Sequence, residues 1–343
     1  MKRKHPMKKN LISATALMVA MSGTAMAGTL ETVQERGAVQ CGVTGGVPGF
    51  SVPDDKGNWK GLDVDLCRAV AAAVLGDATK VKFVPLNAKE RFTALVSGEV
   101  DMLSRVTTWT QTRDTQLGIN FAGVNYYDGQ GFLVKKELGL KSVKELDGAT
   151  VCVQSGTTTE LNMADYFRTH GISYTPVVFD TNDQAAQAFD SGRCDSFTTD
   201  LSQAAGLRTR MQDPSAVGAL PEVISKEPLG PVVRQGDDQW FNIVKWTHNA
   251  MLNAEELGVS SGNADKMKAE SSDPNVKRLL GLDGPKGKGL GLADDWAFQV
   301  VKQVGNYSEA YERNVGKDSP LGLDRGINAL WNQGGLQYAP PMR

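Results

Sequence analysis

Histidine is scarce in this chain of 343 residues, which contains only His5, His170 and His248. The four cysteines form no Cys-x-x-Cys pair. Zinc sites usually draw on closely spaced histidines and cysteines, so we expect no metal site. Histidine is also the side chain most often used for general acid–base catalysis near neutral pH. We therefore expect neither a cofactor nor an enzyme.

Long apolar runs are missing beyond the N-terminus. Five basic residues precede a single apolar run at 11–21, and Ala25-Met26-Ala27 then gives the small-x-small pattern that a signal peptidase cuts. The run is shorter than the roughly 20 residues of a permanent membrane span. No cysteine directly follows the cut, which argues against a lipid anchor. We predict a signal peptide over residues 1–27 and export to a bacterial periplasm.

Positive charge is in short supply once the leader is set aside. The whole chain has 37 Lys and Arg against 39 Asp and Glu, and the leader holds five of the basic residues and none of the acidic ones. The exported part then has a net charge near −7. An acidic surface without basic clusters disfavours nucleic acid as a partner.

The four cysteines, Cys41, Cys67, Cys152 and Cys194, all follow the leader. An even number of cysteines in an exported protein is typical of disulfides. Their spacing favours two local bridges, Cys41 with Cys67 and Cys152 with Cys194, among the three possible pairings. Four buried free thiols are the alternative.

Strand and helix patterns alternate twice along the chain, which is typical of parallel sheets with crossover helices. The predicted strands of the two repeats lie at 39–43, 80–85, 100–103, 149–154, 174–179 and 194–200. Open α/β sheets bind ligands at the carboxyl ends of their strands. Extended segments near 121–135 and 224–234 are predicted to cross between the two units. We therefore expect two lobes, a two-strand hinge and a cleft between the lobes.

The segment from Asp101 to Arg113 follows a predicted strand with several hydroxyl side chains and one arginine. A guanidinium can donate two parallel hydrogen bonds to a carboxylate, and threonine hydroxyls can supply further donors. The segment therefore suits a small carboxylate ligand. Taken alone, it is better explained as an ordinary strand-to-helix turn, with Thr110 or Thr112 as the helix cap and a solvated Arg113.

Two further strand ends carry polar side chains. The turn at 155–158, which includes Thr157 and Thr158, opens a predicted helix whose first N–H groups could bind an anion. Asp200 ends a strand, and a carboxylate facing a cleft there would bind a cation. In both cases the alternative is a simple helix N-cap.

Several motifs resemble one known family in their order and spacing. They lie at 61–66, 92–101, 103–114, 124–132, 156–161 and 192–195. With these segments the chain resembles family 3 of the periplasmic solute-binding proteins, the polar amino acid-binding proteins of bacterial ABC importers. Within the family it is most similar to the general L-amino acid-binding proteins.

The resemblance implies a type II periplasmic binding protein fold with two α/β lobes. Residues 28–131 and 228–343 would form lobe 1, including a C-terminal helical extension, and residues 132–227 would form lobe 2. It also implies a monomer that binds L-amino acids and delivers them to the membrane permease subunits of the importer. The extension itself carries no functional motif, and we expect Trp296, Trp331 and Tyr338 to serve in packing.

The resemblance also implies which residues would hold the α-carboxylate of the ligand. Arg113 would bind it, with help from the backbone N–H of Thr108. Thr158, in the turn with Thr157, would contact it from the other side of the cleft.

The α-ammonium group would take its acceptors from both lobes by the same resemblance. They are the Thr108 hydroxyl, the Val106 carbonyl and the Asp200 carboxylate. Ser104 and Arg105 are set aside, because the family spacing places the contacts at 106 and 108.

The chain departs from the family pattern beside the expected ligand side chain. Family members usually have a stacking aromatic residue after the first strand, whereas this chain has small residues at 44–47 and again at 87–88. Phe50, Trp59 or Trp109 could compensate. The small residues predict a broad, polar specificity.

Two other functions are compatible with the fold. One is an exported enzyme similar to the cyclohexadienyl and arogenate dehydratases, for which Glu160 and Glu90 are the nearest acid–base candidates. The other is a ligand-loaded partner of a chemoreceptor, which would use the same clamp.

Overall fold

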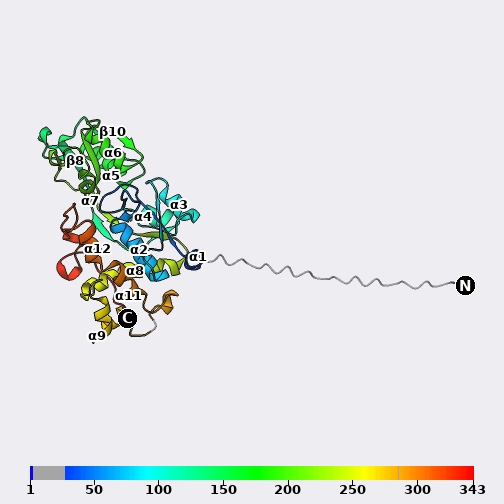
Figure 1. Cartoon of the computed structure of the whole chain (residues 1–343). Coiled ribbons are helices and arrows are strands. Elements are labelled where there is room, and N and C mark those ends of the chain that lie inside the picture. Colours follow the sequence, from blue (N-terminus) through cyan, green and yellow to red (C-terminus); the bar gives the residue numbers. More distant parts are fainter. Residues whose placement is uncertain (3–27, 285) are drawn as a thin grey trace.

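The computed structural model describes residues 1–2, 28–284 and 286–343. The predicted signal peptide falls almost wholly outside these residues. The described chain forms two α/β lobes, with helices α5 and α6 in one and α2, α3 and α8 in the other (Figure 1). No helix in the part that the structure describes combines the length and the apolar composition of a membrane span.

Lobe 1 is built on a five-stranded sheet in the order β4-β1-β5-β14-β6. Its strands are β1 (Val39–Val43), β4 (Val81–Pro85), β5 (Met102–Leu103), β6 (Ile119–Phe121) and β14 (Val232–Arg234). β1 pairs in parallel with β4 and β5, and β14 runs antiparallel to β5 and β6. A small hairpin joins β2 (Val52–Pro53) to β3 (Trp59–Lys60).

The helices of lobe 1 are α1 (Thr29–Arg36), α2 (Leu62–Leu75), α3 (Arg91–Ser97) and α4 (Gln111–Gln116). Helix α2 buries Leu66 and Val70, whose four-residue spacing sets one apolar face of the helix. It ends at Gly76, which adopts a left-handed φ of 69°. Glycine is favoured at such a helix end because it has no Cβ to clash.

Lobe 2 repeats the arrangement with a sheet in the order β10-β9-β11-β8-β12. Its strands are β8 (Gln130–Lys135), β9 (Ala149–Gln154), β10 (Tyr174–Phe179), β11 (Ser196–Asp200) and β12 (Val217–Ala219). Its helices are α5 (Thr158–His170), α6 (Asn182–Asp190) and α7 (Leu201–Arg208). β8 starts at Gln130, two residues before the predicted start of lobe 2.

Two extended segments connect the lobes. β7 (Tyr126–Asp128) and β13 (Glu227–Leu229) pair antiparallel to each other and belong to neither five-stranded sheet. The predicted fold, two α/β lobes joined by a two-strand hinge, is therefore confirmed.

The C-terminal extension covers one side of lobe 1 (Figure 1). Its helices are α8 (Asp238–Glu256), α9 (Ala264–Glu270), α10 (Pro274–Leu279), α11 (Trp296–Val304) and α12 (Tyr307–Asn314). Residues of α2, α8, α11 and α12 share one hydrophobic core. Trp296 is buried as predicted, but Trp331 and Tyr338 are 50% and 66% exposed and pack edge to face on each other. The expected role in packing therefore holds for Trp296 in the core and for Trp331 and Tyr338 against each other at the surface.

The last segment also reaches the hinge. The side-chain amide of Asn328 accepts a hydrogen bond from the Tyr127 N–H at 2.7 Å and donates one to the Tyr127 carbonyl at 2.9 Å. Both groups belong to β7, so Asn328 occupies the place of a neighbouring strand. The Asn328 carbonyl in turn accepts bonds from Arg325, which forms an ion pair with Glu255 of α8.

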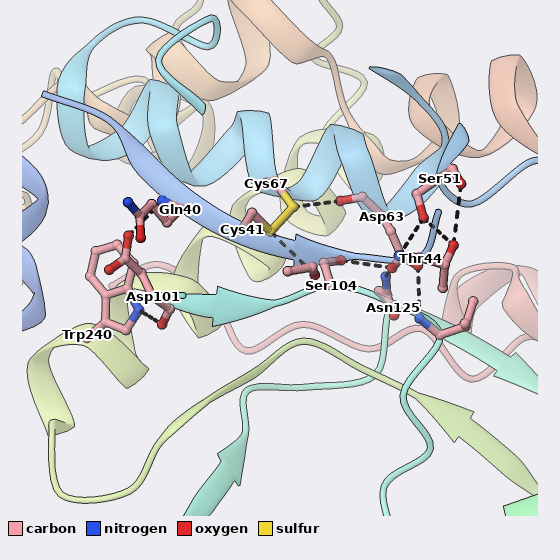
Figure 2. Close-up of a disulfide and its surroundings, with 12 residues drawn as sticks. Gln40, Cys41, Thr44, Ser51, Asp63, Cys67, Asp101, Ser104, Asn125 and Trp240 are labelled. Atoms are coloured by element: carbon pink, nitrogen blue, oxygen red, sulfur yellow. Dashed lines mark hydrogen bonds between the residues drawn. A yellow bond between two sulfur atoms is a disulfide. The ribbon is translucent and has the colours of Figure 1, made fainter. Parts of the chain in front are cut away.

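Disulfides join Cys41 to Cys67 and Cys152 to Cys194, as the spacing favoured. The first ties β1 to α2 inside lobe 1 (Figure 2), and the second lies within lobe 2. Beside the first bridge, Asp101 accepts a bond from the Gln40 N–H at 2.7 Å, and its carbonyl accepts one from the Trp240 indole at 2.9 Å. Asp101, which opens the polar segment, is therefore a structural residue.

Candidate functional site

The polar strand ends of the two lobes face each other beside the hinge. Lobe 1 contributes the loop between β5 and α4, and lobe 2 contributes the start of α5 and the end of β11. Hinge strand β13 adds a buried acid, Glu227. Five of the six sequence-predicted residues thus line one pocket between the lobes, and the sixth, Arg113, donates to the carbonyl of Thr108 beside it.

Arg113 is held inside lobe 1 rather than on a solvated face. The backbone N–H of Arg113 donates to the Thr110 hydroxyl at 3.3 Å, so Thr110 caps helix α4, as the alternative interpretation predicted. The guanidinium is nevertheless only 9% exposed, donates from Nη1 to the Thr108 carbonyl at 2.8 Å, and lies over the Phe92 ring. Burial lowers the pKa of Arg113, while the nearby carboxylates of Glu227 and Asp200 oppose that shift.

Thr108 and Thr158 meet across the lobes. Their hydroxyl oxygens lie 3.2 Å apart, and the Thr158 hydroxyl also donates to Oε2 of Glu227 at 2.9 Å. Because Thr158 is the donor to Glu227, Thr108 is left to donate to Thr158. This contact links lobe 1, lobe 2 and the hinge in one chain of hydrogen bonds.

Thr157 acts as the N-cap of α5. Its hydroxyl accepts from the Glu160 N–H at 3.1 Å and donates to the Gln154 carbonyl at 2.7 Å. The capping alternative considered for this turn therefore describes the Thr157 side chain correctly. Thr157 still lines the cleft beside Thr158.

Val106 has a strained backbone, with a φ of 47° in the left-handed region. This region is costly for a β-branched residue, by about 1–3 kcal/mol. The Val106 N–H donates to the buried carboxylate of Asp63 at 2.9 Å, and Asp63 also accepts bonds from Ser104 and Asn125 (Figure 2). No described group donates to the Val106 carbonyl. The bond to Asp63 therefore stabilises the unusual backbone conformation of Val106. In this conformation the Val106 carbonyl is available to a ligand.

Asp200 ends β11 and is 3% exposed. It occupies the N-cap position of α7, but its side chain makes no capping bond and instead accepts from the Gln203 amide. The capping alternative for Asp200 is therefore wrong. Burial, together with the carboxylates of Asp128 and Glu227, raises the pKa of Asp200 well above its usual range. A nearby cation would stabilise its charged form.

Two adjoining pockets lie between the lobes. The inner pocket is narrow, with about 20 Å³ of free space, and includes Val106, Thr108, Thr157, Thr158 and Asp200 in its lining. The outer pocket offers about 330 Å³. The pockets share four lining residues: Arg105, Gln154, Asn182 and Gln203.

The small residues noted in the sequence line the outer pocket. Gly45, Gly46 and Asn87 are part of its wall. The three aromatic residues considered as replacements are absent from this wall. Phe50 packs against Tyr126, Trp59 against Phe83, and Trp109 stacks on Phe121.

The lobes touch at the rim of the outer pocket. Arg210 of lobe 2 donates to the Gly46 carbonyl at 3.2 Å, and Lys89 pairs with Asp180 at 3.1 Å. A Cβ added to Gly206 would lie only 2.5 Å from the Pro48 carbonyl oxygen, so the lobes approach here more closely than any side chain would allow. These contacts describe a closed arrangement of the lobes.

The lining or neighbouring residues that sequence reasoning missed include Arg91, Arg105, Asn182, Gln203 and Glu227. Arg105 was visible in the polar segment but set aside in favour of the family spacing. The other four lie inside a predicted helix, at helix starts or in the crossing segment. These four residues come together only through the tertiary fold, and no local sequence pattern predicts that they do.

The acid–base candidates of the enzyme hypothesis lie outside the inner pocket. Glu160 accepts from the Gly156 N–H at 2.8 Å, and Glu90 accepts from the Asn87 N–H at 3.4 Å. Both carboxylates are therefore engaged in local turns.

Known proteins resemble this chain along nearly its whole length. A putative amino-acid ABC transporter-binding protein, YhdW of Escherichia coli K12, is 58% identical over 98% of this chain and 100% of its own length. The general L-amino acid-binding periplasmic protein AapJ of Rhizobium johnstonii is also 58% identical, with the same coverage. The glutamate/glutamine/aspartate/asparagine-binding protein BztA of Rhodobacter capsulatus is 51% identical over 98% of this chain and all of its own.

Solved structures show the same relation. A periplasmic binding protein of an ABC transporter from Brucella ovis, with glutathione bound, superposes with a TM-score of 0.91 at 57% identity, covering 93% of this chain and all of that one. The family model for bacterial extracellular solute-binding proteins, family 3, matches residues 39–260. This chain belongs to family 3 of the bacterial extracellular solute-binding proteins.

Proposed function

We propose that this protein is the periplasmic ligand-binding component of an ABC importer for L-amino acids. The observation that carries the proposal is the contact between Thr108 and Thr158, which closes the two lobes over buried groups of opposite charge, Arg113 and Asp200. An α-amino acid has a carboxylate and an ammonium group a few bonds apart. The relatives named above are binding proteins of such importers, which supports the same role here.

Arg113 binds the α-carboxylate in this proposal. Its planar guanidinium can donate two parallel bonds, and its partial burial strengthens them. The backbone N–H of Thr108 supplies a further donor. The Thr158 hydroxyl, which donates to Glu227 in the described structure, would turn its one proton to the ligand carboxylate. Thr157 contributes its place at the start of α5, where the backbone N–H groups favour an anion.

The α-ammonium group lies at the acidic side of the inner pocket. Asp200 accepts from it, together with the Val106 carbonyl and the Thr108 hydroxyl. Burial and the neighbouring carboxylates raise the pKa of Asp200. A bound ammonium would lower that pKa and so favour the charged carboxylate.

Ligand binding and lobe closure are coupled in this mechanism. Arg113 lies in lobe 1 and Asp200 in lobe 2, so both contact one ligand only when the lobes are closed. The closed form of the monomer is then the state that the permease subunits of the importer recognise. No step of this cycle requires chemistry on the ligand, so the protein acts as a binding protein and not as an enzyme.

The outer pocket supports a broad specificity. It is walled by small residues and adjoins the inner pocket, so it can receive side chains of different sizes. The relatives are named for general L-amino acid binding or for four polar amino acids, and the Brucella ovis structure holds glutathione.

Calorimetric titration of ligand-free protein with a panel of L-amino acids and glutathione tests the proposal. We expect binding of several L-amino acids and none of their D-enantiomers, because the clamp fixes both main-chain groups. Native mass spectrometry of the protein as purified would identify a co-purified ligand. Failure of every L-amino acid to bind would refute the proposed function.

A further inference from the structure

Two arginines in the inner pocket have no ionic partner. Arg91 and Arg105 are 2% and 4% exposed, and both line the inner pocket. Neither forms an ion pair with any described residue. The Nε atoms of both are buried without a hydrogen-bond acceptor among the described groups. Arg91 makes a single long bond, from Nη1 to the Thr107 hydroxyl at 3.4 Å.

Structural arginines elsewhere in the chain differ clearly from these two. Arg234 donates to the carbonyls of Leu95 and Val100, at 3.2 and 2.9 Å, and to the Thr29 hydroxyl. Arg325 forms an ion pair with Glu255 at 3.1 Å and also donates to a backbone carbonyl. A buried guanidinium that serves the fold is normally satisfied in this way, because an unpaired buried charge is costly.

The proposed amino acid clamp does not use these two charges. Within the clamp Arg113 takes the α-carboxylate and Asp200 takes the α-ammonium, so the main-chain groups of the ligand are balanced. Arg91 and Arg105 then remain as two positive charges facing the same pocket. Asp200 acts on both from a distance and Asp63 acts on Arg105, but neither carboxylate forms a direct ion pair with them. Burial lowers the pKa of both, that of Arg105 to about 10, which leaves Arg105 charged at neutral pH.

The unpartnered atoms of the pocket favour an anion over a neutral group. The described lining contains three buried polar atoms without partners, the two Nε donors and the acceptor Oδ1 of Asn182. A ligand amide could donate to Asn182 and accept from one guanidinium, but it carries no charge to offset the two guanidiniums. A carboxylate can accept from both guanidiniums, and charged hydrogen bonds are roughly twice as strong as neutral ones.

We propose that Arg91 and Arg105 form a subsite for a second carboxylate, so that acidic L-amino acids are the preferred ligands. The inference rests on the proposed function, since it assigns the ligand side chain to a clamp that already holds the main chain. Arg105 lines both pockets and therefore stands where a side chain leaves the inner pocket for the outer one. Glutamate and glutamine have nearly the same size, so charge alone separates them.

The test compares L-glutamate, L-glutamine and L-alanine by calorimetric titration of ligand-free protein. We expect glutamate to bind about tenfold or more tightly than glutamine, since 1.4 kcal/mol corresponds to a factor of ten. Arg105→Gln and Arg91→Gln should each reduce this ratio sharply and change alanine binding by less than about threefold. Arg105→Lys, which keeps the charge, should restore part of the ratio. The matched control is Arg193→Gln, which removes an exposed arginine of lobe 2 and should leave every affinity unchanged.

The outcomes separate the two proposals. Equal affinity of the parent protein for glutamate and glutamine would overturn the subsite while leaving the proposed function intact. If Arg105→Gln and Arg91→Gln weaken glutamate, glutamine and alanine to the same extent, both arginines act only in the fold and the subsite is again refuted. If the parent protein binds none of the three ligands, the proposed function itself is refuted.

Discussion

Replacing Arg113 with alanine is expected to abolish L-amino acid binding at ordinary concentrations. The guanidinium is 9% exposed, so in the proposed complex its pair with the ligand carboxylate is largely withdrawn from water. Removing one partner of a buried ion pair costs about 3–5 kcal/mol, because the other charge stays buried without compensation. With a factor of ten for each 1.4 kcal/mol, the affinity should fall by between about 100-fold and about 4,000-fold.

The same substitution should change the stability of the free protein much less. In the described structure Arg113 contributes one hydrogen bond to the Thr108 carbonyl and a contact with the Phe92 ring. One such bond is worth about 1 kcal/mol, which corresponds to a shift of a few degrees in the unfolding midpoint. The large effect on binding and the small effect on stability can therefore be told apart.

Calorimetric titration at pH 7, paired with thermal unfolding, measures both quantities. The matched control is Arg113→Lys, which keeps the charge but loses the planar fork, and it should bind with intermediate affinity. If Arg113→Ala folds and binds amino acids like the parent protein, the carboxylate site is elsewhere and the assignment of the clamp is wrong.

Three further predictions concern stability, each measured by urea unfolding. Burial lowers the pKa of His248 to about 4, so the contribution of the neutral imidazole to stability is complete above about pH 6.5 and is lost as the pH falls through 4. The expected loss in the free energy of unfolding is about 3 kcal/mol. His248→Gln should remove this part of the pH dependence. Replacing Cys152 and Cys194 with serine opens a loop with a sequence separation of 42 residues and should cost about 4 kcal/mol; an unchanged midpoint would contradict this. Asn328→Ala leaves two backbone groups of the hinge without their partner and should cost about 2 kcal/mol, whereas a change within error would show that water replaces the amide.

The sequence was most informative where a feature is local. The alternation of apolar segments indicated both sheets, because each strand carries its own apolar pattern. Arg113 and Thr108 lie in one short segment after β5, so their spacing alone brought them forward. Helices α9 and α10 were missed, since seven and six residues are too few to show a helical period.

Features that depend on the packing of distant segments were not predictable in this way. Glu227 is important near the site because β13 pairs with β7, about 100 residues earlier in the chain. Arg105 was set aside because nothing in its neighbourhood shows that its guanidinium lies in the pocket. That fact follows only from the side chains around it, including Asn182 and Gln203 of lobe 2.

The bond pair between Asn328 and Tyr127 bears on where the lobes rotate. Because the Asn328 side chain binds both the N–H and the carbonyl of Tyr127, we expect this hinge strand to stay with lobe 1 when the lobes open. The rotation would then take place closer to lobe 2, at the residues that follow β7. Gly129 stands at that point, and a Cβ there would lie 2.2 Å from the Val223 side chain. The contact that holds this hinge strand thus comes from residue 328, beyond residue 260, where the match to the family model ends.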